Sequence, residues 1–447
     1  MENKGKGKIG LMTATFMLIG TIIGASSFVA SGYQAEAMGP AVWLVYIIGA
    51  LLTVPVCIQS AQIGCVLPVE GSSYVMVKKT SGKLSTFMYG WLYIIWTAIW
   101  LPYCAHTIAK YVRLYIPGAN VYVVAVIALL LFGVIHSFGF EAAARFQSLI
   151  VIILMAAMLV FIIMGAPHVK LSNLTPMFPK GAGPVIGQII PAYFGFVGIN
   201  TMTEWAGNVH KPQKNLPKAM LLCMVIVTLL YCGMTAVLCG MMPYTELGID
   251  TPVSIASMQF GLPAVTALVT LGAMFATIST LNGMYVCLTH ELHNMSCQGN
   301  MPGLFKKTAG KRKAPIVAVW FSVAVAILLS FMSESIMEYI DVATAFVMVS
   351  LIHSAFVSVR LKKVLPKEYE EAAFKMKGIW YYIWPVLEIA SCGFILVVTL
   401  AGSPKLMVPM IVIIGIGIIF YYAYAAKHEA AETEEAGAEG EVQKSIL

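Results

Sequence analysis

The sequence predicts an all-α membrane protein of about twelve transmembrane helices, built as a five-plus-five inverted repeat in which helices 1 and 6 are broken. Composition is the first observation behind this prediction. Of the 447 residues, 59% are hydrophobic and 11% are charged, whereas soluble proteins carry roughly 25% charged residues. The second observation is a succession of apolar runs that approach the ~20 residues of a membrane helix. The third is a pair of glycine interruptions at matching places in two of these runs.

The expected spans follow one another with short loops, and their ends are defined to within a few residues. No cleavable signal peptide is expected, since the first apolar run extends past Val29 without a small-residue cleavage site. Most Lys and Arg residues fall in alternate loops, which by the positive-inside rule places both termini in the cytoplasm. The expected spans are residues 9–33, 41–66, 84–113, 121–138, 146–165, 184–208, 217–241, 262–292, 314–332, 338–360, 380–400 and 404–425.

These spans divide into regions that predict the domain organisation. Because five is an odd number, a second set of five helices enters the membrane from the opposite side, which produces an inverted repeat. Residues beyond 427 are rich in Ala, Glu and Gly and too polar to form a core. We expect a cytoplasmic amino terminus (1–8), a first repeat (9–165), a second repeat (184–360), two further helices (380–425) and a disordered acidic cytoplasmic tail (427–447).

The first break is the stretch that begins at Gly20 and contains Gly24, Ala25, Ser26 and Ser27. Irregular backbone at membrane depth persists only where it lines a protein cavity. Small residues leave amides open to a ligand, and the positive end of a half-helix favours an anionic group such as a carboxylate. The alternative is that these small residues only permit close helix packing.

The second break runs from Phe194 through Gly195, Phe196 and Val197 to Gly198. Carbonyl groups freed by an unwound helix could receive an ammonium group, so a zwitterion would satisfy both breaks. Phe194 is a candidate gate, and its ring could cover a cationic or apolar ligand, although aromatic residues in a membrane core more often serve packing.

Three stretches carry a resemblance to a known family: residues 20–28, 68–74 and 195–217. They resemble the amino acid-polyamine-organocation superfamily, and the match covers nearly the whole chain. The resemblance implies the leucine-transporter-type fold and transport of amino acids or amines. It also implies that Ile23 to Ser27 hold a substrate carboxylate and that Phe194 to Gly198 hold the amine.

Several positions depart from the pattern of that superfamily. Ala25, Ser26 and Ser27 replace a common Gly-Ser-Gly, which narrows the expected pocket near the carboxylate. Asn200 stands where several members carry an acidic residue, and Met284 stands where the resembling arginine/agmatine antiporter has a tryptophan. These differences do not support a dibasic substrate.

The sequence leaves the coupling ion open between H+ and Na+. Some proton-coupled relatives carry a lysine in helix 5, and the matching position is Leu154, so that proton route is not expected. Sodium-coupled members of the wider fold use first-helix carbonyls with eighth-helix hydroxyls, which Thr277, Ser279 and Thr280 could supply. Hydroxyls in membrane helices more often bond to their own backbone.

Ionisable residues inside spans are costly and are functional candidates. Glu204 lies four residues past Asn200, on the same face if the helix has resumed there, and could accept a proton or pair with an amine. Its alternative is a carboxylate at the inner mouth that is neutralised by Lys211 or His210. His106 titrates near neutral pH when unperturbed, although a packing role is the commoner one.

Other classes of function are disfavoured. No phosphate-binding Gly-x-x-x-x-Gly-Lys-Ser/Thr loop, catalytic motif or metal-ligand spacing occurs in the sequence. We therefore expect no enzyme activity, no cofactor, no metal and no nucleic-acid partner. The prediction is a secondary transporter in the cell membrane that moves amino acids or amines. The alternatives are an exchanger without ion coupling and a substrate sensor with a transporter fold.

Overall fold

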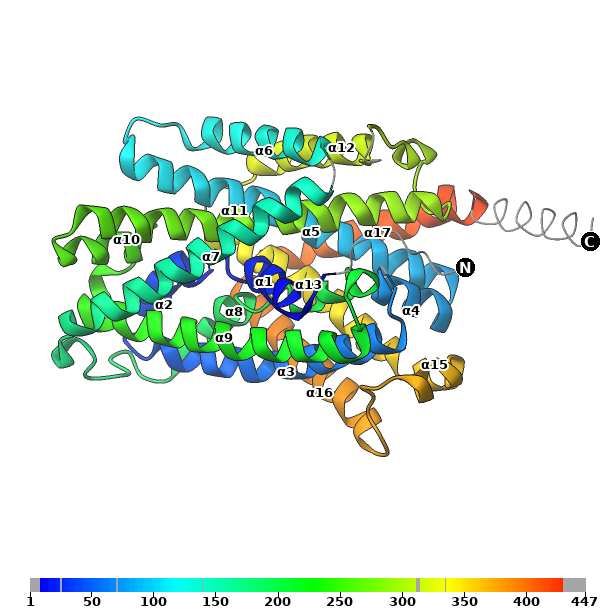
Figure 1. Cartoon of the computed structure of the whole chain (residues 1–447), viewed down its shortest axis with the longest axis horizontal. Coiled ribbons are helices and arrows are strands. Elements are labelled where there is room, and N and C mark those ends of the chain that lie inside the picture. The colour runs from blue at the N-terminus through cyan, green and yellow to red at the C-terminus, as the bar shows by residue number, and fades with distance from the viewer. Residues whose placement is uncertain are drawn as a thin grey trace, which may run out of the picture.

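The computed structural model describes residues 9–24, 26–69, 71–138, 140–310, 314–333 and 335–428. The predicted amino-terminal segment 1–8, Ala25 in the first break, and residues 429–447 of the predicted tail lie outside this part. Within it the chain is helical, and the long helices run side by side along the longest axis of the molecule (Figure 1). The α-helices are α1 (Leu11–Ile22), α2 (Ser31–Met38), α3 (Val42–Val66), α4 (Ser72–Thr80), α5 (Lys83–Tyr115), α6 (Val121–Ser137), α7 (Phe140–Gly165), α8 (Gly183–Phe194), α9 (Pro212–Met241), α10 (Pro252–Ser257), α11 (Pro263–Cys297), α12 (Ile316–Ser330), α13 (Ile336–Ser358), α14 (Leu361–Val364), α15 (Pro366–Glu371), α16 (Trp380–Gly402) and α17 (Met407–Phe420).

Short non-α turns connect these helices, and those at the two breaks matter most. A π-helical turn, η1 (Ser26–Ala30), precedes α2, and two 3₁₀ turns, η4 (Ile199–Thr203) and η5 (Ala206–Asn208), follow α8. In the described ranges the only β-type pairings are isolated bridges, one of which joins Ile9 to Val209. That bridge ties the start of α1 to the chain just beyond the second break.

Nine helices of the described chain are long and apolar enough to cross a membrane, and the bent pair of residues 11–22 and 27–38 makes a tenth. Two shorter apolar helices, α6 and α12, complete the series. Each of the twelve expected spans overlaps one of these helices or the bent pair. The all-helical fold is thereby confirmed, while the number of membrane crossings stays a prediction.

Several helix contacts of the first half of the chain have an equivalent in the second half. The first half contributes α1 with α2, then α3, α5, α6 and α7, and the second contributes α8 with η4, then α9, α11, α12 and α13. α1 packs against α9 and α7, and its counterpart α8 packs against α3 and α13. Likewise α5 packs against α6 and α13, and its counterpart α11 packs against α12 and α7. Each of these contacts therefore has an equivalent when the halves are exchanged.

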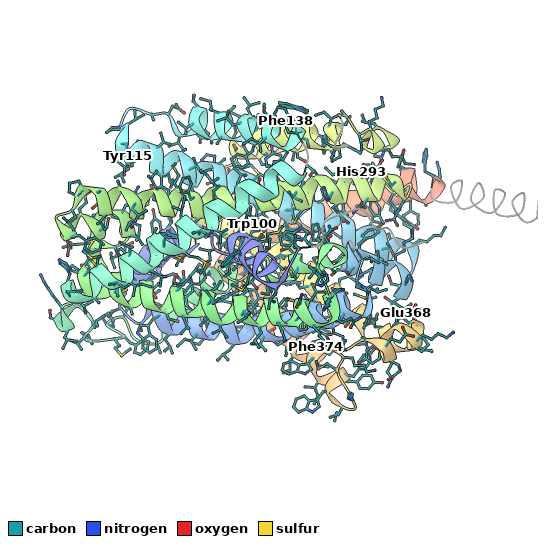
Figure 2. The ribbon with its side chains drawn as sticks, in the orientation of Figure 1. Trp100, Tyr115, Phe138, His293, Glu368 and Phe374 are labelled. Atoms are coloured by element: carbon teal, nitrogen blue, oxygen red, sulfur yellow. The ribbon has the colours of Figure 1, made fainter. Side chains whose placement is uncertain are left out.

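Helix α5 and the segment from α8 through η4 are the most deeply buried spans, and the outer helices expose apolar side chains. Trp96 and Trp100 of α5 are at most 1% exposed. Figure 2 places Trp100 in the middle of the molecule and Tyr115 and Phe138 toward its edge. Since exposed apolar residues cover α16 and α17, these surfaces suit the hydrocarbon of a bilayer rather than water.

Candidate substrate site between two broken helices

The first break begins where α1 ends at Ile22. Ile23 adopts an extended conformation, with φ −74° and ψ 96°, and the chain then turns through η1 into α2. The two halves of this broken helix make an angle of 49°. Gly24 and Ser27 lie in the break, and Ser26 opens η1. The predicted interruption is therefore present at the expected residues.

The carbonyl groups at the end of α1 accept hydrogen bonds from other helices. A helix end leaves its last four carbonyls without an intrahelical donor, and three hydroxyl groups, from α11 and α9, supply donors here. Ser279, Thr280 and Tyr231 thus act as caps for residues 20–23. The distances are 2.6 Å from Ser279 Oγ to Gly20 O, 3.4 and 3.3 Å from Thr280 Oγ1 to Thr21 O and Ile23 O, and 3.4 Å from Tyr231 Oη to Ile22 O.

The amides of the first break face a different situation. Among the described residues, the backbone N–H of Gly24 donates to no backbone acceptor. The hydroxyl oxygen of Ser27 is fully buried and has no hydrogen-bond partner among them either. Buried polar groups in native proteins are almost always hydrogen-bonded. These groups therefore suit a ligand or water that accepts hydrogen bonds.

The second break is built differently. α8 ends at Phe194, and Gly198 adopts φ +110°, a left-handed conformation that favours glycine. The chain continues as the 3₁₀ turns η4 and η5 and returns to α-helix only at Pro212. Asn200 and Glu204 are therefore not one α-helical turn apart. With about three residues per turn, Asn200 aligns with Thr203 instead, whose Oγ1 donates to Asn200 O at 2.7 Å.

Most carbonyl groups of the second break already have donors. Phe194 O and Phe196 O accept backbone N–H groups, and Gly195 O accepts the Tyr231 hydroxyl at 3.0 Å. In the described part of the chain no donor reaches Val197 O, and Val197 is 4% exposed. Val197 O is thus the acceptor that this break leaves open.

The two breaks meet in space. A Cβ atom added to Gly198 would lie 3.6 Å from Ile22 Cγ1, 3.6 Å from Thr21 Cγ2 and 3.7 Å from Met284 Cε. The structure therefore brings together α1, the second break and Met284 of α11, whose role in binding a substrate stays a prediction. Tyr231 of α9 spans both breaks with one hydroxyl group and was not identified from the sequence.

Aromatic rings surround the end of α8. The rings of Phe194 and Trp100 are stacked, with centroids 4.4 Å apart, and Tyr103 meets Phe194 edge-on at 5.5 Å. Neither Trp100 Nε1 nor Tyr103 Oη has a hydrogen-bond partner among the described residues, and both side chains are at most 1% exposed. Phe196 packs edge-on against Tyr231 at 5.4 Å. The site thus combines apolar rings with polar atoms that lack protein partners.

Helix α7 contributes a neutral amide to the first break. Gln147 Nε2 donates to Ser279 Oγ at 2.8 Å, and Gln147 Oε1 accepts from Asn282 Nδ2 at 2.9 Å. A Cβ atom on Gly20 would lie 2.9 Å from Gln147 Nε2. Leu154, the position expected from sequence counting, is buried two turns further along α7. Among the described side chains of α7, Gln147 is therefore the polar one that reaches the break.

The remaining coupling candidates lie in different surroundings. Thr277 donates to its own helix at Ala273 O, 3.3 Å away. His106 Nε2 lies 2.9 Å from Ser330 O, and its ring packs against Tyr122 and Tyr339. Both residues fit a packing role, since these hydrogen bonds and ring contacts lead to residues outside the breaks. Glu204 directly follows η4, on the carboxyl-terminal side of the second break.

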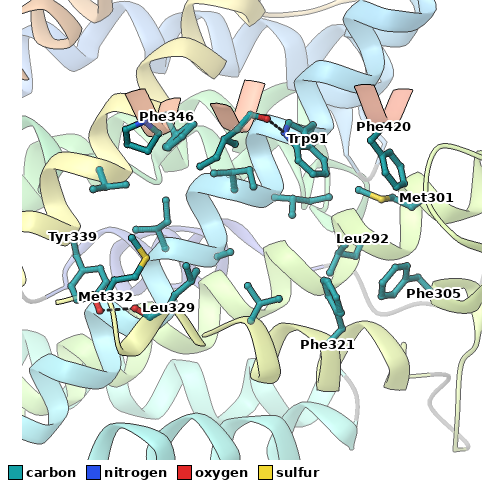
Figure 3. Close-up of a pocket in the computed structure, with 18 of the residues that line it drawn as sticks. Trp91, Leu292, Met301, Phe305, Phe321, Leu329, Met332, Tyr339, Phe346 and Phe420 are labelled. Carbon is teal, nitrogen blue, oxygen red and sulfur yellow. Dashed lines mark hydrogen bonds between the residues drawn. The ribbon is translucent and has the colours of Figure 1, made fainter. Parts of the chain in front are cut away.

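An apolar cavity of about 690 Å³ lies elsewhere, among α5, α12, α13 and α17 (Figure 3). Its wall includes Trp91, Phe305 and Phe346 and contains no charged side chain. Trp91 Nε1 is bonded to Ile413 O at 3.1 Å. None of the residues of the two breaks lines this cavity, and its chemistry does not match a zwitterion.

Long apolar helices packed side by side, two of them broken at facing positions, are typical of a multi-pass membrane protein of the permease type. The family model for amino acid permeases matches residues 13–431, and the chain belongs to this family. It is 27% identical to the branched-chain amino acid permease BcaP of Bacillus subtilis (strain 168), over 96% of this chain and 95% of the relative. It is 28% identical to the methylthioribose transporter of the same strain, over 93% and 92%. It is 24% identical to the gamma-aminobutyric acid permease of Escherichia coli (strain K12), over 91% of each.

Proposed function

We propose that the chain is a secondary transporter that moves amino acids or related amines across the cell membrane by alternating access. The meeting of the two breaks carries this proposal, since a Cβ atom added to Gly198 would be in van der Waals contact with Ile22 and Met284. A substrate carboxylate would accept hydrogen bonds from the N–H group of Gly24 and the hydroxyl group of Ser27 at the start of the resumed helix. Its ammonium group would donate to Val197 O.

The walls of the site favour a neutral substrate with an apolar side chain. Phe194, Trp100 and Met284 are buried and carry no charge. Position 200 carries an asparagine and not a carboxylate, so it offers no negative charge to balance a second positive charge on the substrate. The printed names of the relatives fit this class, since they include permeases for branched-chain amino acids and gamma-aminobutyric acid. Branched-chain amino acids are therefore the first substrates to test.

The proposal includes a twelve-helix inverted repeat with both termini in the cytoplasm. The exchange symmetry of the helix contacts supports the repeat, because α1 with α9 corresponds to α8 with α3. The excess of Lys and Arg in alternate loops supports the orientation. A rocking motion of one set of helices against the other would then open the breaks to each side in turn.

Sodium coupling at the first break is the weaker form of the proposal. The hydroxyl groups of Ser279 and Thr280 already donate to carbonyls of α1, and the Gln147 amide donates to Ser279 Oγ. A sodium ion there would have to displace these bonds. Exchange without ion coupling, or coupling to protons, requires no such displacement.

Uptake by purified protein in liposomes tests the function. Labelled leucine, gamma-aminobutyrate and other amino acids are offered against unlabelled amino acid inside, and sodium and pH gradients are imposed separately. Uptake that needs only internal amino acid identifies an exchanger, and dependence on one gradient identifies the coupling ion. Binding without uptake would identify the sensor alternative, and folded protein with neither would refute the proposal.

A further inference from the structure

Two carboxylates lie together beyond the second break, on the predicted cytoplasmic side. Glu204 follows η4 and is half-buried, whereas Glu291 of α11 is 3% exposed. The two side chains are close enough to interact electrostatically. A Cβ atom on Gly71 would lie 3.7 Å from Glu204 Oε2 and 3.9 Å from Asn294 Nδ2, one turn of α11 from Glu291. The end of η4 and this face of α11 therefore adjoin.

Neither carboxylate has a cationic partner in the described part of the chain. The ion pairs there involve Asp250, Glu338 and Glu370 instead. His210 and Lys211, the neutralising residues expected from the sequence, form no ion pair with Glu204. Two buried like charges without a counter-ion are costly, and binding of a proton removes one of them.

Glu291 also has an oxygen without a partner. Among the described residues nothing donates to Glu291 Oε1, which has almost no solvent contact. This oxygen packs against the bare backbone of Gly90 in α5, where a Cβ atom would lie 2.8 Å from Oε1 and 2.5 Å from Met295 Sδ. The missing side chain at position 90 thus makes room for the carboxyl group, and the orphan oxygen marks a place for a proton.

Among the described residues, the groups that interact with the pair carry no permanent positive charge. Tyr89 and Tyr93 of α5 and Cys287 of α11 interact electrostatically with one or both carboxylates. Glu388 of α16 interacts with Tyr89, and His353 of α13 packs edge-on against the Tyr89 ring at 6.0 Å. No Lys or Arg is among these groups, so a proton is the positive charge that this environment can take up.

We propose that Glu204 and Glu291 bind one proton between them and exchange it with the cytoplasm during the transport cycle. This inference rests on the proposed transport function. Glu204 keeps partial solvent exposure, and Glu291 forms the buried end of the site. A hard metal cation takes about six oxygen ligands, whereas the neighbours of Glu291 Oε1 are a glycine and a thioether. The described residues also contain no group of three His, Cys, Asp or Glu side chains that could hold a metal ion.

The proton site is connected directly to the second break. The N–H group of Gly71 donates to Glu204 O at 3.3 Å, and Ser73 Oγ donates to Thr203 Oγ1 at 2.9 Å. Thr203 in turn donates to Asn200 O. Loss of the proton would place two negative charges at the end of this 3₁₀ segment and strain its contact with α11. The bonds therefore provide a path from protonation to the geometry at Gly198.

Infrared difference spectroscopy on the purified full-length protein tests the proton site without a substrate. The wild type should show a protonated-carboxyl band that disappears as the pH is raised. Glu291→Gln should lose this band, and Glu204→Gln should keep it but lose it at lower pH than the wild type, because the repelling neighbour is gone. Glu338→Gln, at the exposed pair with Lys405, is the matched control and should follow the wild type. An unchanged titration in Glu204→Gln or an unchanged band in Glu291→Gln would overturn the proposal.

Transport measurements then separate the proton site from the proposed function. An inward pH gradient should drive accumulation of labelled substrate by the wild type and by Glu338→Gln. Glu291→Gln should lose this accumulation far more completely than it loses exchange of labelled for unlabelled substrate. Wild-type exchange without any response to the pH gradient, or a requirement for sodium, would overturn the proton site and leave transport standing. Absence of all exchange would refute the transport function, and the infrared result would still decide the proton site.

Discussion

The two broken helices reach the same place by different means. At the first break the end of α1 is held by hydroxyl groups of Ser279, Thr280 and Tyr231, and an α-helix resumes after one π-helical turn. At the second break a single left-handed glycine, Gly198, sets the turn, and the chain stays in 3₁₀ geometry as far as Asn208. Stretches of 3₁₀ helix within a span often mark hinges. The comparison indicates a fixed anchor at the first break and a deformable element at the second.

Substitution of Gly198 should have the largest effect. Gly198→Leu forces a branched side chain into a left-handed conformation, at a cost of about 1–3 kcal/mol. The side chain would also fill the space between Ile22 and Met284. We expect loss of exchange in liposomes with normal membrane insertion. The matched control is Gly187→Leu, earlier in α8, where a Cβ atom meets nothing within 4 Å. Exchange at the wild-type rate in Gly198→Leu would remove the second break from the site.

Phe194 should follow Gly198 in the size of its effect. Phe194→Ala removes the ring that stacks on Trp100 at 4.4 Å. Burial of such a ring contributes about 3–5 kcal/mol to stability, and we expect a lower melting temperature together with a roughly tenfold or greater loss of apparent substrate affinity. Phe161→Ala, another fully buried ring that packs on Phe260, should lose comparable stability and keep the affinity of the wild type. Equal affinity losses in the two variants would assign Phe194 a packing role only.

An alanine at each break tests the comparison directly. In Gly24→Ala the new Cβ atom would lie 2.9 Å from Thr280 Oγ1, and the threonine can rotate away at the cost of its bonds to α1. One such bond contributes about 0.5–1.5 kcal/mol, so we expect less than a tenfold increase in apparent KM. Gly198→Ala should be more harmful because its backbone, unlike that of Gly24, is left-handed. The apparent KM and the rate of exchange are measured for both variants in parallel. Equal effects would contradict the distinction between a fixed anchor at the first break and a deformable element at the second.

Much of the fold could be predicted from the sequence because membrane helices are recognisable by their length and their apolar composition. The expected spans all contain helices, and the glycine interruptions lie where the breaks occur. The boundaries are less accurate. α9 begins at Pro212, since proline is well suited to the first turn of a helix, whereas the sequence predicted a start at 217. The sequence also could not show that the chain after Gly198 remains in 3₁₀ turns, because local composition does not distinguish these from an α-helix.

The partners of the breaks were harder to predict than the breaks themselves. Tyr231, Gln147 and Tyr103 come from three different helices, and the two tyrosines lie in segments that are largely apolar on every side. Without an amphipathic pattern, nothing in the sequence identifies the face that points inward. Glu291 lies near the end of a predicted span, yet it is 3% exposed. Its burial depends on Gly90 in another helix, and such a tertiary relation has no local signal.

The smallest effect should come from Tyr231, the residue that joins the two breaks. Tyr231→Phe removes the hydroxyl that lies 3.0 Å from Gly195 O and 3.4 Å from Ile22 O. The ring keeps its packing against Tyr46 and Phe196. Loss of the hydrogen bond costs about 1 kcal/mol, which corresponds to roughly a fivefold change in an equilibrium constant.

The control for this change is Tyr285→Phe in α11. The Tyr285 hydroxyl donates to Leu129 O at 3.4 Å, away from both breaks, so this variant loses a bond of the same kind without touching the site. If Tyr231 couples the breaks, its variant should raise the apparent KM for exchange, whereas Tyr285→Phe should leave it unchanged at similar thermal stability. Matching kinetics in the two variants would mean that the fixed and the deformable break act independently, and the link between them would have to run through Met284 instead.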